Sequence, residues 1–417
     1  MRCACCQWVD DVSWQDLGAA LIGCPSAHVA RKLRRQLGTW ARDRGHQLIW
    51  VEATDDDVLI DRLARAADAL SPLERRDCRV LLLADRAELF RYQPPEGASP
   101  DWSLLGRAFA AESLAVILAR YRDRWLIDLL REDRLTFHYQ PVIDATTGRA
   151  FGYECLLRGI DAGGGPASAE VPTSRDPAAS SGEGSTRRDE GGTIGPVTML
   201  TAAQRMGLLH ALDQAARTKA VASAPVVAMG PSARLFVNVL PQTVYDPAHC
   251  LQPMFEAAQA AGLAPGQLVL EVSGAAGQAD ENHLRGLFDF VRSRGWAVCI
   301  DDLGGGPEGL LGLVHLETDL VKLDMQRVDG RTDRLAENLV QIARDRGIRV
   351  IAECVEQPEQ LRQALGIGVD LVQGRLLCEP AAQLPPRGRQ SNWLARISQF
   401  RAATGSARQP QSVQPQR

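Results

Sequence analysis

The stretch FHYQPVIDATTGRAFGYECLLRG, residues 137–159, decides the fold of most of this chain. Two β-type runs meet here, Thr136–Gln140 and Ala150–Leu156, and they are separated by the turn residues Asp144–Gly148. A connection of that length suits a hairpin, whereas parallel strands need a crossover of about a dozen residues or more. The first strand is therefore expected to run antiparallel to the second.

Further β-type runs follow along the chain, with helical stretches between them. Eight strands with intervening helices over about 250 residues are typical of a TIM-type barrel. We therefore predict an α/β fold, namely a modified (βα)8 TIM-type barrel with one antiparallel strand. The later strands are expected at Leu235–Leu240, Leu268–Val272, Ala297–Ile300, Leu320–Leu323, Arg349–Ala352 and Leu371–Val372.

The region before the barrel is expected to be separate from it. Residues 1–107 predict a small N-terminal α/β domain of sensory or regulatory role, an expectation that rests on architecture alone. Residues 108–131 carry apolar positions at three- and four-residue spacing and predict one connecting helix. The alternation in the first domain rests on helical stretches at Ala27–Arg44 and Val58–Ala69 and strand-like runs at Gln47–Val51 and Arg79–Ala84.

The barrel is expected to span residues 132–385. An insertion at 161–195 is rich in Gly, Ser, Pro, Asp and Arg, cannot build a core and is predicted to be disordered. The tail, residues 386–417, is predicted to be largely disordered as well, with a short amphipathic helix at Asn392–Ala402.

Composition narrows the class of protein further. The chain has 417 residues, of which 45% are hydrophobic and 24% charged, so wholesale disorder and a fibrous class are excluded. A net charge of -4 gives no case for DNA binding, and no apolar run reaches the roughly 20 residues of a membrane span. The start MRCACCQWVDD does not resemble a secretory signal, so we expect a cytoplasmic protein whose ten cysteines are thiols.

Polar residues mark the ends of the predicted strands, which is where a TIM barrel carries its active site. Glu154, Leu156 and Arg158 are spaced by two and so share one side of an extended segment. A single polar strand end is ordinarily a solvated position or a surface ion pair, but seven consecutive ones indicate a shared site. The later strands contribute Asn238, Glu271, Asp301 with Asp302, Lys322 with Asp324, Glu353 with Glu356 close behind, and Gln373.

The residue types at these positions indicate a metal-dependent reaction on phosphate. Hard oxygen donors suit Mg²⁺ or Mn²⁺ rather than zinc. Because Asp301 and Asp302 are adjacent, one could bridge two ions while the other binds the second. Two such ions activate a water and stabilise the leaving oxygen of a phosphodiester, and the fork of Arg158 matches phosphate oxygens. The oxygen donors are Glu154, Asn238, Glu271, Asp301 and Asp302.

The motifs that hold these residues resemble those of the EAL-domain cyclic-di-GMP phosphodiesterases. In the opening stretch, Cys155 stands where the alanine that gives the family its name usually stands. The motifs FVNVL, LVLEVS, IDDLGGG, DLVKLD, VIAECVE and DLVQG follow in order, so the resemblance covers residues 132–382. The fold that it implies, a (βα)8 barrel with one antiparallel strand, agrees with the strand count.

The resemblance implies hydrolysis of cyclic-di-GMP to linear pGpG, with two Mg²⁺ or Mn²⁺ ions and a homodimer formed through the barrel. Lys322 would position and help activate the attacking water. Glu353 would be a general base or a water-orienting group. The metal ligands would be Glu154, Asn238, Glu271 and Asp301, with Asp302 for the second ion; the dinucleotide contacts would be Gln140, Leu156 and Arg158, with support from Gln373, Asp324 and Glu356.

Two departures from the family pattern keep a second function open. Gly274 stands where a second glutamate usually holds the loop after the aspartate pair, and that loop reads DDLGGGPEG instead of the usual DDFGTGYSS. A loosened loop lowers metal affinity without removing a ligand. The alternative is therefore a degenerate, weakly active or inactive barrel that binds cyclic-di-GMP or a protein partner.

The cysteines and lysines leave smaller questions. Cys155 and Cys354 are interpreted as compact apolar substitutes, with a redox switch as the alternative. The group Cys3, Cys5 and Cys6 could bind metal with Cys24 or Cys78, although its spacing matches no standard zinc pattern. Three lysines among 47 basic residues make Lys322 notable, because lysine offers a compact amine where the chain otherwise uses arginine.

Overall fold

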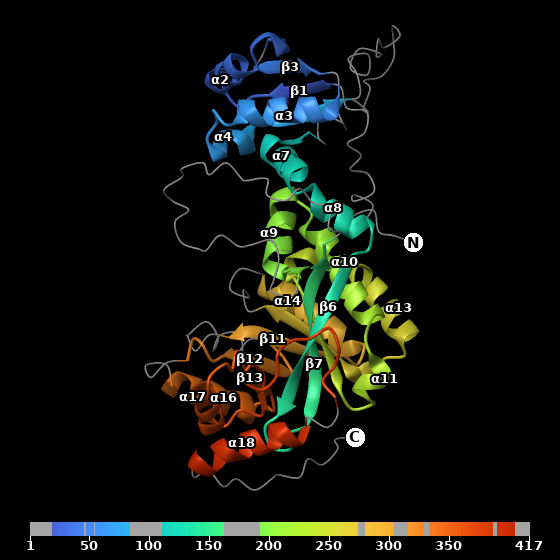
Figure 1. Ribbon diagram of the computed structural model, residues 1–417, viewed down its shortest axis with the longest axis vertical. Coiled ribbons are helices and arrows are strands. Elements are labelled where there is room, and N and C mark those ends of the chain that lie inside the picture. Colours follow the sequence, from blue (N-terminus) through green and yellow to red (C-terminus); the bar gives the residue numbers. More distant parts are fainter. Residues whose placement is uncertain are drawn as a thin grey trace. The chain divides into compact units, whose positions relative to one another are not determined.

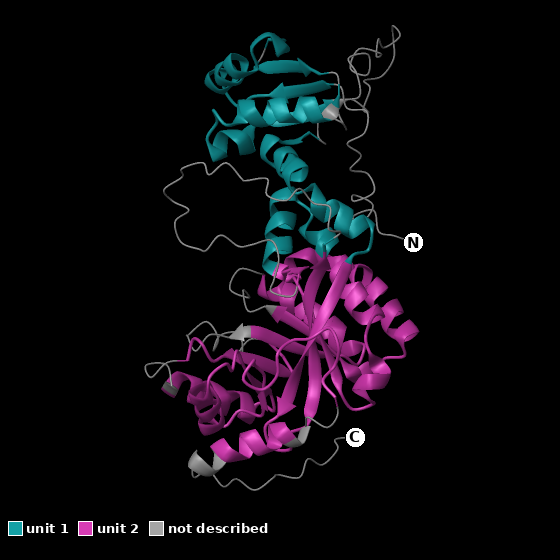
Figure 2. Ribbon diagram, viewed as in Figure 1, with its two compact units in different colours: residues 1–134, 161–187, 197–212 teal, residues 135–160, 188–196, 213–417 magenta. Residues whose placement is uncertain are grey.

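The computed structural model describes residues 19–45, 47–53, 55–83, 111–161, 192–273, 280–303, 316–328, 333–386 and 390–404. The chain divides into two compact units (Figure 2). Unit 1 comprises residues 1–134, 161–187 and 197–212, and unit 2 comprises residues 135–160, 188–196 and 213–417. Each unit has a hydrophobic core of its own.

Unit 2 is a closed barrel, which confirms the predicted fold (Figure 1). Its strands are β6 (Leu135–Asp144), β7 (Ala150–Ile160), β9 (Arg234–Val239), β10 (Leu268–Ser273), β11 (Ala297–Leu303), β12 (Leu320–Asp324), β13 (Arg349–Glu353) and β14 (Leu371–Val372). They pair in the order β6-β14-β13-β12-β11-β10-β9-β7, and the pairing of β6 with β7 closes the ring. As predicted, β6 runs antiparallel to both of its neighbours, whereas the other pairs in the ring are parallel.

Helices cover the outside of the barrel. In α14 (Glu281–Ser293) the buried residues Leu284, Leu287, Phe288 and Val291 recur at three- and four-residue spacing, which gives one apolar stripe facing the strands. Other helices of unit 2 are α11 (Val226–Met229), α12 (Pro247–Cys250), α13 (Gln252–Ala261), α16 (Asp333–Asp345) and α17 (Pro358–Ile367), with 3-10 turns η2 (Pro241–Thr243) and η3 (Pro265–Gln267). After β8 (Thr193–Ile194), nearly all of α9 (Pro196–Met206) and the first four residues of α10 (Leu209–Ala222) belong to unit 1.

An apolar layer fills the interior of the barrel. It consists of Val142, Phe236, Val269, Cys299, Leu320, Ile351 and Leu371, one residue from each strand except β7. On β7 the layer position belongs to Gly152, where a Cβ would lie 2.5 Å from the Arg234 carbonyl oxygen and 2.7 Å from the Phe236 ring. Glycine therefore leaves room for that ring. Because strand side chains alternate, the residues two places along each strand also point inward.

Unit 1 contains the predicted small α/β region. Its five-stranded sheet has the order β2-β3-β1-β4-β5, and all neighbouring strands are antiparallel. The sequence analysis missed the first strand, which lies ahead of the first predicted helix. The elements are β1 (Ala19–Gly23), α2 (Ala27–Leu37), η1 (Gly38–Trp40), β2 (Ala41–Asp43), β3 (Leu48–Glu52), α3 (Asp56–Ala67), α4 (Pro72–Asp77), β4 (Arg79–Leu83) and β5 (Glu112–Ser113).

Two helix predictions in unit 1 were wrong in extent. The helix predicted over Ala27–Arg44 ends at Leu37, because Gly38 takes a positive φ of 56°. The single connecting helix predicted at 108–131 is instead two helices, α7 (Leu114–Arg122) and α8 (Arg124–Arg131).

Local hydrogen bonds explain the boundaries of these two helices. Ser113 caps α7 by accepting from the Val116 amide, so the helix begins after it. Asp123 leaves helical geometry at φ -103°, and its carboxylate accepts from Arg205 Nη2 at 2.8 Å. The beginning of the predicted helix, residues 108–110, lies outside the described residues.

The C-terminal segment contains the helix predicted at Asn392–Ala402, extended by two residues at each end. Residues 390–404 form a helix, α18 (Gln390–Thr404), whose Trp393 and Ile397 are buried in the core of unit 2. The indole of Trp393 donates to the Leu377 carbonyl at 3.2 Å. Residues 405–417 of the predicted tail, and residues 162–191 of the predicted insertion, lie outside the described residues, while residues 193–194 of that insertion form β8, which pairs with β7.

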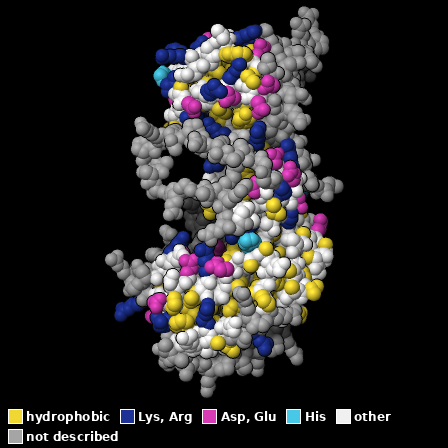
Figure 3. Space-filling view, viewed as in Figure 1, with side chains coloured by type: hydrophobic (Ala, Val, Ile, Leu, Met, Phe, Trp, Pro, Cys, Tyr) yellow, Lys and Arg dark blue, Asp and Glu magenta, His cyan; other side chains and the backbone are white. Residues whose placement is uncertain are grey.

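The surface carries charges of both signs, as expected from 47 basic and 51 acidic residues in the chain. On the face shown in Figure 3, acidic and basic side chains of the described residues are interspersed with apolar ones. Among the helices that the structure describes, none is long and apolar enough to cross a membrane.

Candidate active site

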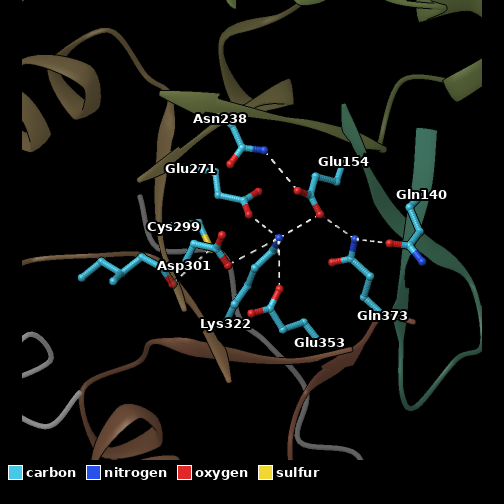
Figure 4. Close-up of polar contacts among 10 residues, drawn as sticks. Gln140, Glu154, Asn238, Glu271, Cys299, Asp301, Lys322, Glu353 and Gln373 are labelled. Atoms are coloured by element: carbon cyan, nitrogen blue, oxygen red, sulfur yellow. Dashed lines mark hydrogen bonds and ion pairs between the residues drawn. The ribbon is translucent and has the colours of Figure 1, made fainter. Parts of the chain in front are cut away.

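Polar side chains form a second layer above the apolar one, at the carboxyl ends of the parallel strands (Figure 4). On most strands the polar residue follows the apolar one by two positions. On β6 it precedes Val142, because that strand runs the other way. The eight residues, one on each strand or, for Gln373, directly after it, are Gln140, Glu154, Asn238, Glu271, Asp301, Lys322, Glu353 and Gln373.

Lys322 lies at the centre of this polar layer and is 1% exposed. Its Nζ donates to Glu154 Oε2 at 2.8 Å and to Glu271 Oε1. Two further carboxylates lie close to the same atom, Glu353 Oε2 at 3.6 Å and Asp301 Oδ1 at 3.7 Å. Four acidic side chains thus surround one ammonium group, which leaves the cluster with an excess of negative charge if all of them are ionised.

Glu154 links Lys322 to a row of amides. Asn238 Nδ2 donates to Glu154 Oε1 at 3.1 Å, and Gln373 Nε2 donates to Glu154 Oε2 at 2.7 Å. The same Gln373 amide also donates to Gln140 Oε1 at 3.2 Å. Glu154 therefore accepts from donors on three other strands, and its orientation is fixed by them.

The charges in the cluster shift the pKa values of its members. Burial raises the pKa of Glu154, but the charge of Lys322 and the three donors outweigh burial and lower it. Burial, with the nearby Glu154 carboxylate, raises the pKa of Glu271 well above its usual range. Burial lowers the pKa of Lys322, but the surrounding carboxylates outweigh burial and raise it. Lys322 therefore favours its charged form. Glu271 is the acid of the cluster whose ionised form is least stabilised by its surroundings.

The chemistry of the donors fits a hard divalent cation. Glu154, Asn238, Glu271 and Asp301 offer carboxylate and amide oxygens, and Glu271 Oε2 is buried without a hydrogen-bond partner among the described residues. The positions of the side chains fit less well, because they converge on the ammonium of Lys322. Within the described ranges, no three His, Cys, Asp or Glu side chains are placed to hold a metal ion.

Leu156 and Arg158 continue along β7 beyond Glu154 and are partly buried. The Nη1 atom of Arg158 donates to the Leu157 carbonyl at 2.9 Å. Both residues share the alternation of Glu154, so the structure places them on the side of the strand that the sequence predicted.

Two predicted supporting residues make contacts other than those of the cluster. The Asp324 carboxylate accepts from the Gln326 amide at 2.8 Å and pairs with Arg327 at 3.2 Å, so it stabilises the turn after β12. Glu356 pairs with Arg375 at 3.8 Å.

Part of the predicted site lies outside the described residues. The backbone of Asp302 belongs to β11, but its side chain is not described. Gly274 and residues 304–309 of the altered loop are not described either. The placement of a second metal ion stays a prediction.

One feature that the sequence analysis did not find is the close packing behind Gln373. Cys354 has a φ of 55°, in the left-handed region, and Gly374 has a φ of 158°. A Cβ on Gly374 would lie 2.1 Å from the Val355 carbonyl oxygen. The Val355 amide donates to the Gln373 carbonyl at 3.1 Å, so this contact fixes the backbone that carries the Gln373 side chain. The glycine after glutamine in DLVQG is the sequence signal of this packing.

We expect Gly374→Ala to lower the free energy of unfolding by about 2–3 kcal/mol, because the new methyl group meets the Val355 backbone. Denaturant unfolding measures the change. The matched control is Gly366→Ala in α17, where a Cβ meets nothing within 4 Å and alanine favours the helix by about 0.5–1 kcal/mol. Equal stability of Gly374→Ala and wild type would contradict the packing.

Comparisons with known proteins agree with the resemblance to EAL domains that the sequence motifs indicate. The EAL domain family model matches residues 185–380. A cyclic di-GMP phosphodiesterase, NbdA of Pseudomonas aeruginosa, is 26% identical over 257 residues, which are 60% of this chain and 29% of NbdA. The cyclic di-GMP phosphodiesterase PdeL of Escherichia coli is 32% identical over 101 residues, 23% of this chain and 28% of PdeL.

Among solved structures, the FimX EAL domain of Xanthomonas citri in complex with c-diGMP is similar in fold. Its TM-score is 0.51 at 17% sequence identity, and the match covers 64% of this chain and 96% of that one. The chain spans less than a third of the length of the first curated relatives that it matches.

A closed barrel with one reversed strand and a lysine-centred acidic cluster at its carboxyl rim defines a class of TIM-type barrel proteins. With the motif series, the match of residues 185–380 to the EAL domain family model makes this chain similar to the proteins of that family.

Proposed function

We propose that this chain hydrolyses cyclic-di-GMP to linear pGpG in a reaction that needs Mg²⁺ or Mn²⁺. The observation that carries the proposal is the contact of Lys322 Nζ with carboxylates from four other strands, at the rim where barrel enzymes hold their active sites. The match of residues 185–380 to the EAL domain family model supports it, as do relatives that are named cyclic di-GMP phosphodiesterases.

In this proposal Glu154, Asn238, Glu271 and Asp301 would hold one ion, and Asp302 would serve a second. Two such ions would supply an activated water and stabilisation of the leaving oxygen. Lys322 stays protonated, because the carboxylates raise its pKa, so it donates hydrogen bonds to the water or to a phosphate oxygen and is not the base.

Glu353 is the residue that we assign to orient the water or to accept its proton. Its carboxylate lies 3.6 Å from Lys322 Nζ, and its side chain is 12% exposed, more than those of Glu154 and Glu271. A partly exposed carboxylate can pass a proton on to solvent, which a fully buried one cannot.

The substrate contacts follow from the alternation on β7. Arg158 offers a planar fork that matches phosphate oxygens, and Leu156 offers apolar surface between Arg158 and the acidic cluster. Gln140, on the neighbouring strand, is fixed by donating to the Cys378 carbonyl at 3.1 Å, so we assign it to the dinucleotide as well.

A second candidate function is that of a binding module that holds cyclic-di-GMP or a partner without cleaving it. One observation favours it. The carboxylates already converge on Lys322, and among the residues that the structure covers no three acidic, His or Cys side chains hold a position for a metal ion. Gly274, in place of the usual glutamate, fits the same candidate.

The test is incubation of the purified full chain with cyclic-di-GMP and Mg²⁺ or Mn²⁺, with products identified by chromatography and mass. We expect pGpG, and we expect EDTA to prevent its formation. Calorimetry on the same preparation measures nucleotide binding. Binding without product in either metal would overturn the enzyme and support the binding module, and a folded protein that neither binds nor cleaves would overturn both.

We also propose a cytoplasmic homodimer, formed through the barrel, with a regulatory partner for residues 1–107. Analytical ultracentrifugation of the full chain tests the dimer. A monomer at concentrations that support activity would rule it out.

A further inference from the structure

Two cysteines face each other in unit 1. Cys24 directly follows β1, and Cys78 directly precedes β4. These strands are antiparallel neighbours, and their register sets Gly23 opposite Arg79. Cys24 and Cys78 therefore occupy opposite positions one step beyond the ladder, and their side chains are in hydrogen-bond contact with each other.

The backbone around the pair suits a cross-strand bond. The Cys24 amide donates to the Gln47 carbonyl at 3.1 Å, and the Cys78 amide donates to the Glu74 carbonyl at 3.1 Å. Neither amide is used to bond the opposite cysteine. Opposite residues on antiparallel strands that do not exchange backbone hydrogen bonds have Cα atoms about 4.5 Å apart. That separation lies within the range that a disulfide spans.

The two thiols differ in reactivity. The hydrogen bond from Cys78 lowers the pKa of Cys24 against the effect of burial, and the charge of Arg34 lowers it further. The hydrogen bond to Cys24, together with burial, raises the pKa of Cys78. Cys24 is also the more exposed of the two, at 9% against 0%. Cys24 is thus the thiol with the lowered pKa and the greater, although small, exposure.

We propose that Cys24 and Cys78 form a redox pair that closes into a disulfide by exchange with a small disulfide such as oxidised glutathione. The Cys24 thiolate attacks one glutathione sulfur, which breaks the S–S bond and releases one glutathione thiolate. Cys78 then loses its proton to solvent and attacks Cys24 Sγ, which releases the second glutathione. Two protein thiols are oxidised, and one glutathione disulfide is reduced to two thiols.

The bond would join two turns that are far apart in the chain. Cys24 leads into α2 through the cap residue Ser26, and Cys78 ends α4. Both cysteines belong to the core of unit 1, so a disulfide would hold helix ends on that core. It would stabilise unit 1 mainly by restricting the unfolded chain, and reduction would release that restriction.

The experiment uses the full chain with Cys3, Cys5 and Cys6 changed to serine, because these competing thiols lie outside the described residues. The reduced protein is equilibrated in glutathione buffers of increasing oxidation, then alkylated and mapped by mass spectrometry. We expect a peptide that links Cys24 to Cys78 and a melting temperature that rises by about 5 °C or more.

Single variants separate the steps. Cys78→Ser should accumulate a glutathione adduct on Cys24, because the second exchange cannot occur, whereas Cys24→Ser should lose the link and carry little adduct. Cys250→Ala, a buried cysteine of the barrel, is the matched control and should form the link as before. The proposal is overturned if both cysteines stay alkylatable in fully oxidised glutathione, or if Cys24 keeps its adduct while Cys78 is present.

Discussion

Replacing Lys322 by methionine should strongly lower turnover and destabilise the barrel at the same time. The side chain keeps its approximate length but loses the ammonium that four carboxylates surround. Removing one partner of a buried ion pair costs about 3–5 kcal/mol, because the other charge stays buried without compensation. Loss of a donor at the reacting centre should lower turnover by about 100- to 1000-fold. Denaturant unfolding and the pGpG assay measure the two effects.

The origin of the instability can be tested separately from activity. If uncompensated charge is the cause, adding Glu271→Gln to Lys322→Met should recover part of the lost stability, since one buried carboxylate is then neutral. Mg²⁺ or Mn²⁺ should stabilise the single variant more than wild type. Lys219→Met, in α10, is the matched control and should change stability by less than about 0.5 kcal/mol. A Lys322→Met protein as stable as wild type in EDTA would refute the charge argument.

The second large effect is expected from Glu154→Gln, which keeps the size of the side chain and removes its charge. Three donors, from Asn238, Gln373 and Lys322, aim at this carboxylate. An amide in its place presents an NH₂ group to at least one of them. We expect turnover to fall by about 100-fold or more and Mn²⁺ affinity to fall with it.

The fold of Glu154→Gln should survive, because Lys322 keeps its contact with Glu271. Circular dichroism and Mn²⁺ titration by calorimetry check the two parts of the prediction. Glu359→Gln, at the exposed start of α17, is the matched control and should leave both turnover and affinity as in wild type. Wild-type Mn²⁺ affinity in Glu154→Gln would remove this residue from the ligand set.

The barrel was predictable because its strands are apolar runs bounded by turn residues or helical stretches, so each is visible without its neighbours. The inward positions at strand ends were predictable for the same reason, since side chains alternate along β10, β11 and β12. Gln140 is the instructive exception. It lies on the reversed strand β6, where the polar residue comes before the apolar one, so the rule of polar strand ends cannot find it. The family resemblance alone pointed to it.

Other features depend on contacts that sequence periodicity does not contain. The convergence on Lys322 requires the ring to close, because its partners lie on strands up to 168 residues away. The break at Asp123 depends on Arg205, which lies 82 residues further on. The helix α18 was predicted, but the burial of Trp393 and Ile397 depends on the core of unit 2 against which they pack.

The reversal of β6 also decides where the rest of the chain attaches to the barrel. In a ring of parallel strands the first strand begins at the rim opposite the polar layer. Here Leu135 begins its strand beside the carboxyl end of β7, because Leu135 pairs with Gly159. The chain thus enters the barrel, and leaves β7 at Ile160, on the same rim as Lys322. Gln140 and Glu154 therefore lie on the two strands whose ends receive and release the chain at that rim.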